Sequence, residues 1–341
     1  MHTALTALPF LGLIALLSVA VFGLRAGREA TGEVRRLARA ASFIMLAASL
    51  AAAAAVAIAG SASLSAFGLG IRLDALSVVM AVLVSFVGMI VVCYSVRYLD
   101  GDERQCAFFG NVLLTLAAVV ALVLSPSTIQ LAIAWIATSL ALHQLLVFYP
   151  DRPKAVLAAR KKFITARCSD LCVIGAAALL FAAFGTTDIG AILSAAEGAA
   201  AGDGVPAQAV YAAGLIALAA ILKSAQFPSH GWLPEVMETP TPVSALLHAG
   251  IINAGGFLVV RFADVMVLSA SSLHALAIIG GFTALFGAVV MLTQTNIKTS
   301  LAWSTVAQMG FMLLQCGLGA FALAVLHIVA HSLYKAYAFL S

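Results

Sequence analysis

Charged residues are scarce in this sequence. Asp, Glu, Lys and Arg make up only 9% of its 341 residues, while hydrophobic residues make up 63%, whereas about a quarter of the residues of soluble proteins are charged. The mean hydropathy of +1.10 supports the same conclusion. This shortage excludes a soluble globular domain. It also argues against nucleic-acid binding, because the few cations lie in short connectors between apolar runs. We therefore predict an integral membrane protein, with the lipid bilayer as its surroundings.

Two further patterns are missing. No alternation of apolar and polar residues recurs over segments of about ten residues, so the apolar runs are predicted to be membrane helices rather than barrel strands. The five cysteines form no C-x-x-C pair, and no closed set of His, Asp or Glu ligands lies beside them. No nucleophile with a neighbouring base is apparent either. We expect no metal, no cofactor and no catalytic residues in this chain.

Basic residues are concentrated in two connectors. Residues 25–39 carry five arginines against two glutamates, and residues 151–167 carry six cations against one aspartate. Four predicted helices separate them, so both connectors lie on the same side, which the positive-inside rule identifies as the cytoplasm. The first apolar run, residues 5–24, has no Lys or Arg before it, so we expect a retained helix rather than a signal peptide.

The hydropathy pattern predicts an all-α, polytopic transmembrane bundle of about eleven helices. Residues 1–72 are expected to hold helices one and two, and residues 73–341 to hold helices three to eleven. Residues 60–72 and 185–206 are expected to be outer loops, the second with a short interfacial helix around 189–197. The expected helices are 5–24, 40–59, 74–94, 109–124, 128–149, 168–184, 207–227, 241–262, 273–293, 297–314 and 320–340.

The stretch from Lys223 to His248 interrupts this pattern. It reads K-S-A-Q-F-P-S-H-G-W-L-P-E-V-M-E-T-P-T-P-V-S-A-L-L-H. Its four prolines are Pro228, Pro234, Pro240 and Pro242. Proline removes a backbone donor and clashes with the preceding turn, so we expect a broken helix here. Broken backbone at membrane depth lines protein-filled or water-filled cavities, and an ionisable residue beside it is a candidate for ion conduction.

Other ionisable residues lie inside the apolar runs. We predict that Lys223 relays protons, the alternative being a lysine that extends to the membrane surface. His248, about two turns into its helix, is a second relay candidate or else an ordinary buried histidine. His327, His331 and Lys335 are spaced at i, i+4 and i+8 and share one face of the last helix. That stripe favours a hydrated proton path over a metal site, because no third ligand is spaced nearby.

Four more charged or titratable residues are weaker candidates. His143 in helix five is a further member of the proton path. Lys298, at the start of helix ten, either serves a cytoplasmic entrance or points to water. Arg167 and Asp170 are three residues apart on a helix, so we expect an ion pair. That pair is either structural or adjusts Lys223 across helices.

These motifs resemble a known family. The stretch that begins at Lys223, together with Q-T-N-I-K-T-S-L-A-W-S-T-V-A-Q-M-G-F-M and H-I-V-A-H-S-L-Y-K-A, is similar to the antiporter-like subunits shared by respiratory complex I and the Mrp sodium/proton antiporters. The resemblance runs from about residue 73 to residue 341. It implies a bundle with a broken helix seven and a proton path through Lys223, continued by His248 and helix eleven. It also implies a twelfth, broken helix after Ser341, so we expect a truncated chain.

One position departs from the complex I pattern. Those members carry Trp-Glu on helix five, where the glutamate pairs with the central lysine, whereas this chain has Trp135-Ile136. The pattern is most similar to the membrane subunits of DAB inorganic-carbon complexes. That similarity implies a bacterial inner-membrane subunit that conducts H⁺ or Na⁺ for a large cytoplasmic, zinc-containing, carbonic-anhydrase-like partner, which accumulates bicarbonate or CO₂. The alternatives are a complex I or Mrp-type Na⁺/H⁺ subunit and, in another class, a non-conducting membrane anchor.

Overall fold

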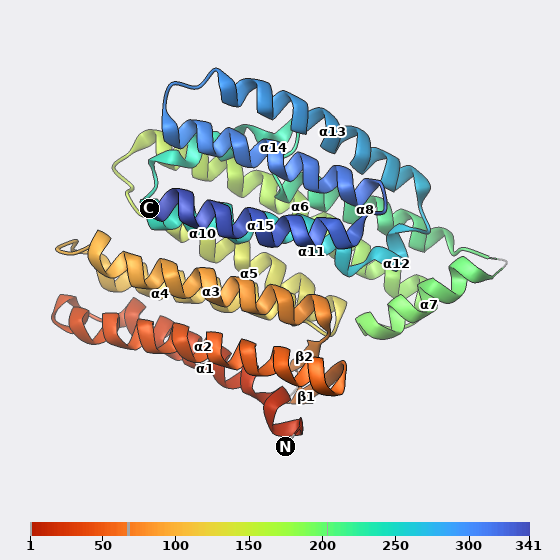
Figure 1. Cartoon of the computed structure of the whole chain (residues 1–341), viewed down its shortest axis with the longest axis horizontal. Helices are drawn as coiled ribbons and strands as arrows, with labels where there is room; N and C mark the ends of the chain where they lie inside the picture. Colours follow the sequence, from red (N-terminus) through yellow and green to blue (C-terminus); the bar gives the residue numbers. More distant parts are fainter. Residues whose placement is uncertain (1, 67–68, 203) are drawn as a thin grey trace.

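Helices dominate the computed structural model, which describes residues 2–66, 69–202 and 204–341. They run roughly parallel to one another in a layered bundle (Figure 1). Within the described residues, nine helices are long and apolar enough to cross a membrane. Two further helices, α8 with 17 residues and α14 with 21, lie among them. The eleven-helix bundle that the sequence predicts is therefore confirmed.

The long helices are α1 (His2–Arg25), α2 (Thr31–Ala59), α3 (Ala75–Tyr98), α4 (Gln105–Val123), α5 (Thr128–Leu146), α6 (Pro153–Phe184), α8 (Ala207–Lys223), α13 (Ala270–Leu292), α14 (Ile297–Gly317) and α15 (Phe321–Leu340). The shorter helices are α7 (Ile189–Ala201), α9 (Trp232–Glu235), α10 (Thr241–Ala249), α11 (Ala254–Arg261) and α12 (Ala263–Met266). Two strands, β1 (Ala62–Ala66) and β2 (Leu69–Leu73), pair antiparallel.

One end of the bundle gathers the basic connectors. The turns from α1 to α2, from α3 to α4 and from α5 to α6 lie together at the left of Figure 1. Arg28 pairs with Glu103, and Arg35 pairs with Asp100 at 2.5 Å, so the first two of these turns are in contact. We call this the basic end, and we call the opposite end, which carries β1 and β2, the hairpin end.

Two expected helix starts and one expected loop near the bundle ends are wrong. α2 begins at Thr31 instead of near residue 40, and α6 begins at Pro153 instead of near residue 168. Proline suits the first turn of a helix, because the N–H that it lacks would be unpaired there in any case. Residues 60–72, expected as a loop, contain the β1–β2 hairpin. Gln130 anchors that hairpin by accepting from the amide and donating to the carbonyl of Gly70, each at 2.9 Å.

The predicted helix break is present. α8 ends at Lys223 rather than at residue 227, because Ala225 turns the chain with a positive φ of 50°. The four prolines lie outside long helices or at helix starts. Pro228 follows α8, Pro234 lies in the short α9, Pro240 precedes α10, and Pro242 lies in the first turn of α10.

The following helix is also divided. Residues 241–262 were expected to form one helix, but it is interrupted at Gly250 between α10 and α11. Polar side chains bond to the carbonyls around this interruption. Ser224 Oγ donates to the Ile252 carbonyl at 3.1 Å, and Asn253 Nδ2 donates to the Ala249 carbonyl at 3.2 Å. Protein groups therefore bond to the broken backbone, as burial in a membrane protein requires.

Small residues bring α13 and α14 into close contact. A Cβ atom at Gly280 would lie 2.7 Å from the Gly310 carbonyl oxygen, and one at Gly287 would lie 2.9 Å from the Ala307 amide nitrogen. Membrane helices associate through such close packing, because lipid supplies no hydrophobic drive between them. This pair forms the uppermost layer in Figure 1.

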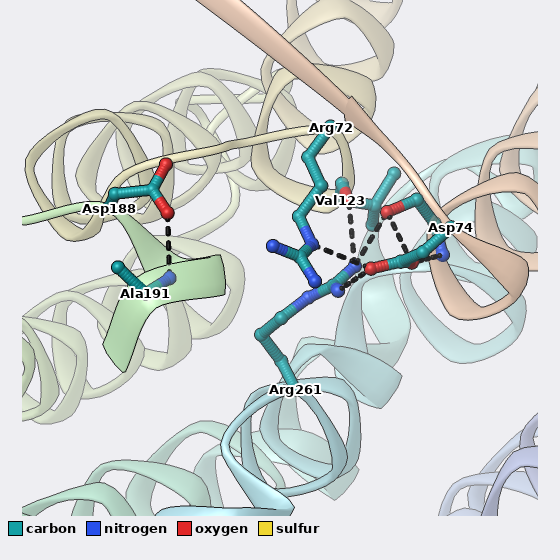
Figure 2. A network of polar contacts seen from close by, with 7 residues as sticks. Arg72, Asp74, Val123, Asp188, Ala191 and Arg261 are labelled. Carbon is teal, nitrogen blue, oxygen red and sulfur yellow. Dashed lines mark hydrogen bonds and ion pairs between the residues drawn. The ribbon is translucent and has the colours of Figure 1, made fainter. Parts of the chain in front are cut away.

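An ionic clamp joins distant parts of the chain at the hairpin end (Figure 2). The Asp74 carboxylate, which caps α3, pairs with Arg72 of β2 at 2.7 Å and with Arg261 of α11 at 2.6 Å. Arg261 is buried and also donates to Ser77 Oγ at 2.6 Å. Burial alone would raise the pKa of Asp74, but the charge of Arg261 and hydrogen bonds from both arginines hold it well below its usual range.

Candidate functional site

Lys223 is buried inside the bundle and is 6% exposed. Its ammonium donates to Ser139 Oγ at 2.7 Å and to Thr138 Oγ1 at 3.3 Å, and it lies 4.4 Å from the centre of the Trp135 ring. These three α5 residues share one helix face by their spacing. The alternative of a lysine that extends to the membrane surface does not fit this geometry.

A second buried lysine shares the site. Lys162 of α6 is 5% exposed, and its ammonium donates to the main-chain carbonyl of Ser139 at 2.9 Å. Ser139 therefore accepts from both lysines. A cavity of about 10 Å³ beside them is bordered by Lys162, Thr165 and Lys223 among apolar side chains, which is near the smallest space that holds one water molecule.

Lys162 is a site residue that the sequence does not predict. Residues 151–167 are expected to be a connector, but α6 already begins at Pro153. A signal was present in the sequence, because Lys162, Ala166 and Asp170 recur every four residues. All three are buried in the structure. A helix that continued through the connector would have placed them on one inward face.

The acid of this site stands on α6. Asp170 pairs with Arg167 at 2.7 Å, as their spacing predicted. It also interacts electrostatically with Lys223 and Lys162. Ile136 occupies the position at which the resemblance expects a glutamate, and it borders an apolar recess between α5 and α6. An acid on the neighbouring helix therefore accompanies Lys223 where α5 offers none.

The structure brings one of the two weaker path candidates to this site. His143 lies one turn beyond Ser139 on α5, toward the basic end, and interacts electrostatically with Lys162 and Arg167. Its ring lies 5.1 Å from that of Phe163. Lys298 lies instead in the first turn of α14, and no hydrogen bond or ion pair joins its ammonium to Lys223 or Lys162 within the described residues.

A second polar cluster joins α10, α14 and α15. His248 Nδ1 lies 2.9 Å from Thr305 Oγ1. Thr305 donates to the Leu301 carbonyl at 3.1 Å, and the Lys335 ammonium donates to the same carbonyl at 2.8 Å. Phe339 stacks on the His248 ring at 4.9 Å between centroids. The structure thus links His248 to Lys335 through Thr305, a residue that carried no signal in the sequence.

The histidines of α15 extend this cluster. The rings of His327 and His331 are 6.1 Å apart, and His331 interacts with the main chain of His248. Within the part of the chain that the structure describes, the buried Nε2 atoms of these three histidines have no hydrogen-bond partner. Each of these nitrogens can take a proton or bond to water. Nowhere in residues 2–66, 69–202 and 204–341 do three His, Cys, Asp or Glu side chains gather as metal ligands.

The two clusters approach each other at the α10–α11 interruption without direct contact between their cations. Ser224, next to Lys223, donates to the Ile252 carbonyl at 3.1 Å. On the other side of the interruption, Asn253 donates to Ser332 of α15 at 2.9 Å. Polar groups thus lead from the lysine site to the helix that carries the two histidines and Lys335.

Comparison with known protein families shows to which family this chain belongs. The family model described as "NADH:quinone oxidoreductase/Mrp antiporter, TM" matches residues 125–341. The chain belongs to this antiporter family. A second model, "NADH-Ubiquinone oxidoreductase (complex I), chain 5 N-terminus", matches residues 61–109. The resemblance found in the sequence motifs is confirmed, and the chain is a multi-pass membrane protein.

Relatives within the antiporter family differ in their named functions. "Probable inorganic carbon transporter subunit DabB" of Hydrogenovibrio crunogenus (strain DSM 25203 / XCL-2) is 47% identical over 280 residues, which cover 82% of this chain and 54% of that protein. "NAD(P)H-quinone oxidoreductase chain 5" of Synechocystis sp. (strain ATCC 27184 / PCC 6803 / Kazusa) is 37% identical over 275 residues, which cover 80% of this chain and 40% of that protein. The chain spans about half the length of the inorganic-carbon relatives that it matches.

Solved structures share the antiporter-like fold. A chain of the Mrp complex from Dietzia sp. DQ12-45-1b aligns with a TM-score of 0.86 at 31% identity, covering 97% of this chain and 37% of that chain. A chain of the archaeal membrane-bound sulfane sulfur reductase aligns with a TM-score of 0.81 at 17% identity, and the alignment covers 99% of this chain and 69% of that chain. The second likeness shows the fold alone.

Proposed function

We propose that this chain is the proton-conducting membrane subunit of an inorganic-carbon accumulating complex. The observation that carries the proposal is Ser139, which accepts hydrogen bonds from two buried lysines, Lys223 and Lys162. Ionisable groups are costly inside a membrane and mark ion pathways when they occur there. The 47% identity to DabB supports the link to inorganic carbon.

The proposed path begins at the basic end near His143. It passes through Lys162 and Ser139 to Lys223, all within one cluster of contacts. A water molecule in the neighbouring cavity can complete the transfer between the lysines. Lysine and histidine side chains donate and accept protons, whereas two ammonium groups repel Na⁺. We therefore favour H⁺ over Na⁺ as the conducted ion.

The second half of the proposed path follows the polar cluster that joins α10, α14 and α15. Polar groups at the α10–α11 interruption lead to His248, and Thr305 leads on to Lys335. His331 and His327 continue along α15 toward the hairpin end. Lys298 stays a candidate for a cytoplasmic entrance, because it lies in the first turn of α14, one turn before Leu301 of the second cluster.

In this proposal the carbon chemistry belongs to another protein. A large, zinc-containing, carbonic-anhydrase-like partner docks on the basic end, and proton flow through the chain energises its capture of bicarbonate or CO₂. The excess of arginine and lysine at that end supports placing it in the cytoplasm of a bacterium, with the bundle in the inner membrane. The chain itself needs no cofactor for this role.

The Lys223→Ala variant tests conduction. We expect proton uptake by proteoliposomes that contain the reconstituted complex to fall by at least about 100-fold, since a positioned proton-transfer group contributes roughly 100-fold or more. Lys154→Ala, which removes an exposed lysine of α6, is the matched control and should conduct normally. Normal uptake by an assembled Lys223→Ala complex would remove Lys223 from the path, and absent uptake by the wild-type complex would mean that the chain is a non-conducting anchor.

Co-purification tests the partner separately. A tagged chain should bring down a large protein that contains zinc, and Lys223→Ala should leave that assembly intact. If subunits of complex I or of an Mrp antiporter co-purify instead, the inorganic-carbon assignment is refuted.

A further inference from the structure

A recess of about 600 Å³ opens at the basic end, between α2 and α3. It is bordered by Arg39 of α2 and by Cys93, Tyr94, Val96, Arg97 and Tyr98 of α3. Arg39 and Arg97 are exposed. Within the described part of the chain, neither guanidinium group has a hydrogen bond or an ion pair. Two helices thus present unpaired cations to one hollow, which the proton path does not use.

The depth of this recess matches the headgroup level of a bilayer. α3 starts at Ala75, so Arg97 lies about 33 Å further along its axis, just beyond a hydrocarbon core of roughly 30 Å. The rings of Tyr94 and Tyr98 stack at 5.7 Å between centroids. Tyrosine side chains prefer this interfacial level, so the two arginines and two tyrosines stand where lipid phosphates lie.

The surroundings of the recess are positively charged. Lys298 and Arg152 act electrostatically on Tyr98. Two acids of the neighbouring α3–α4 turn are bound to arginines near the α1–α2 turn. Arg39 and Arg97 therefore border the recess directly, while Lys298 and Arg152 add positive charge near Tyr98.

We propose that this recess binds the phosphate of an anionic phospholipid from the leaflet at the basic end. Guanidinium groups offer forked donors that fit phosphate oxygens, and the tyrosine hydroxyls add further donors. The apolar faces of α2 and α3 continue from the recess into the hydrocarbon and accommodate the acyl chains. Basic pockets at the cytoplasmic ends of membrane helices suit such headgroups.

Lipid binding here would also support the start of α10. The Tyr98 hydroxyl lies 3.4 Å from both the amide nitrogen and the hydroxyl oxygen of Thr241. A phosphate bound beside Tyr98 therefore bridges α2 and α3 next to the segment that leads into the divided helix. Because the folded chain alone forms this site, bound lipid should raise its thermal stability.

Lipid titration of the purified full chain in detergent tests the site. We expect phosphatidylglycerol, but not phosphatidylcholine, to raise the melting temperature and to appear as a bound adduct in native mass spectrometry. Arg39→Gln and Arg97→Gln should each weaken the apparent affinity about fivefold, as expected for one basic residue near an anionic surface. Together they should weaken it about 25-fold. The pair Arg36→Gln and Arg160→Gln removes the same charge from exposed positions outside the recess and should have little effect.

Three results would overturn the proposal. Equal weakening by the control pair would show that only the net charge attracts lipid. Equal binding of phosphatidylcholine, which has no net charge, would show that the site does not recognise the net negative charge of phosphatidylglycerol. Equal stabilisation by inorganic phosphate would assign the recess to a free anion rather than to a lipid. None of these measurements depends on proton conduction.

Discussion

Ser139 is the residue on which the candidate site depends. Its hydroxyl accepts from Lys223 at 2.7 Å and its carbonyl accepts from Lys162 at 2.9 Å. Two ammonium groups bonded to one residue repel each other, and Asp170 is the carboxylate that acts on both. The loss or gain of one proton therefore changes the electrostatic energy of the whole site. That sensitivity suits a group that passes protons along.

Lys162 is predicted to be required for conduction. Lys162→Gln keeps a donor for the Ser139 carbonyl but cannot exchange protons near neutral pH. We expect about 100-fold slower proton uptake in proteoliposomes, in line with the loss of one proton-transfer group. Arg160→Gln, which changes an exposed cation on the same helix, should conduct at the wild-type rate. Wild-type conduction by Lys162→Gln would remove this lysine from the path.

At the scale of elements, the prolines were the most informative residues. They predicted the break after α8 correctly, because a missing backbone donor is a local property. The interruption at Gly250 was not predicted, because a single glycine costs a helix only about 1 kcal/mol, against about 3 kcal/mol for proline, and so carries a weaker signal. Its position depends on Ser224 and Asn253, which bond to the carbonyls on either side.

The contact between α13 and α14 should depend on the absence of a side chain at Gly280. Gly280→Ala places a Cβ 2.6 Å from the Leu314 amide nitrogen, so the helices must separate. Gly281→Ala is a matched control, because its Cβ would meet only the Leu314 side chain at 3.7 Å. We expect Gly280→Ala to lower the melting temperature in detergent by several degrees, as a loss of about 1–3 kcal/mol would. Gly281→Ala should be neutral or stabilising, and equal effects of the two would contradict close helix contact.

At the scale of the whole molecule, the Asp74 clamp joins the β2 strand, α3 and α11 at the hairpin end (Figure 2). Arg261 and Asp74 are far apart in the sequence, so their contact holds together helices that are distant along the chain. Removing one partner of a buried pair leaves the other charge uncompensated, which costs about 3–5 kcal/mol.

Asp74→Asn should therefore destabilise the chain by about 3 kcal/mol in denaturant unfolding in detergent. The pKa of Asp74 is lower in the folded state than the unfolded value of about 3.9, so its contribution is complete above about pH 4 and is lost only in stronger acid. The destabilisation should thus be constant from pH 5 to pH 8. Asp188→Asn, which keeps a cap for α7, is the control and should change little. A penalty that varies across this pH range would contradict the ion pair.

The sequence by itself determined the membrane class, the all-α bundle, the family and the broken helix, because composition, hydropathy and proline chemistry act locally. It also singled out Lys223, because this lysine lies beside a proline-broken helix in an apolar sequence, and it singled out the α15 stripe and the Arg167–Asp170 pair, because their spacing sets them on shared helix faces. Only the tertiary structure decided which of these groups meet. The rotation of each helix about its axis, fixed by packing, turns Lys162 toward Ser139 and Thr305 toward His248. The local sequence of a helix does not determine how the helix is rotated against its neighbours.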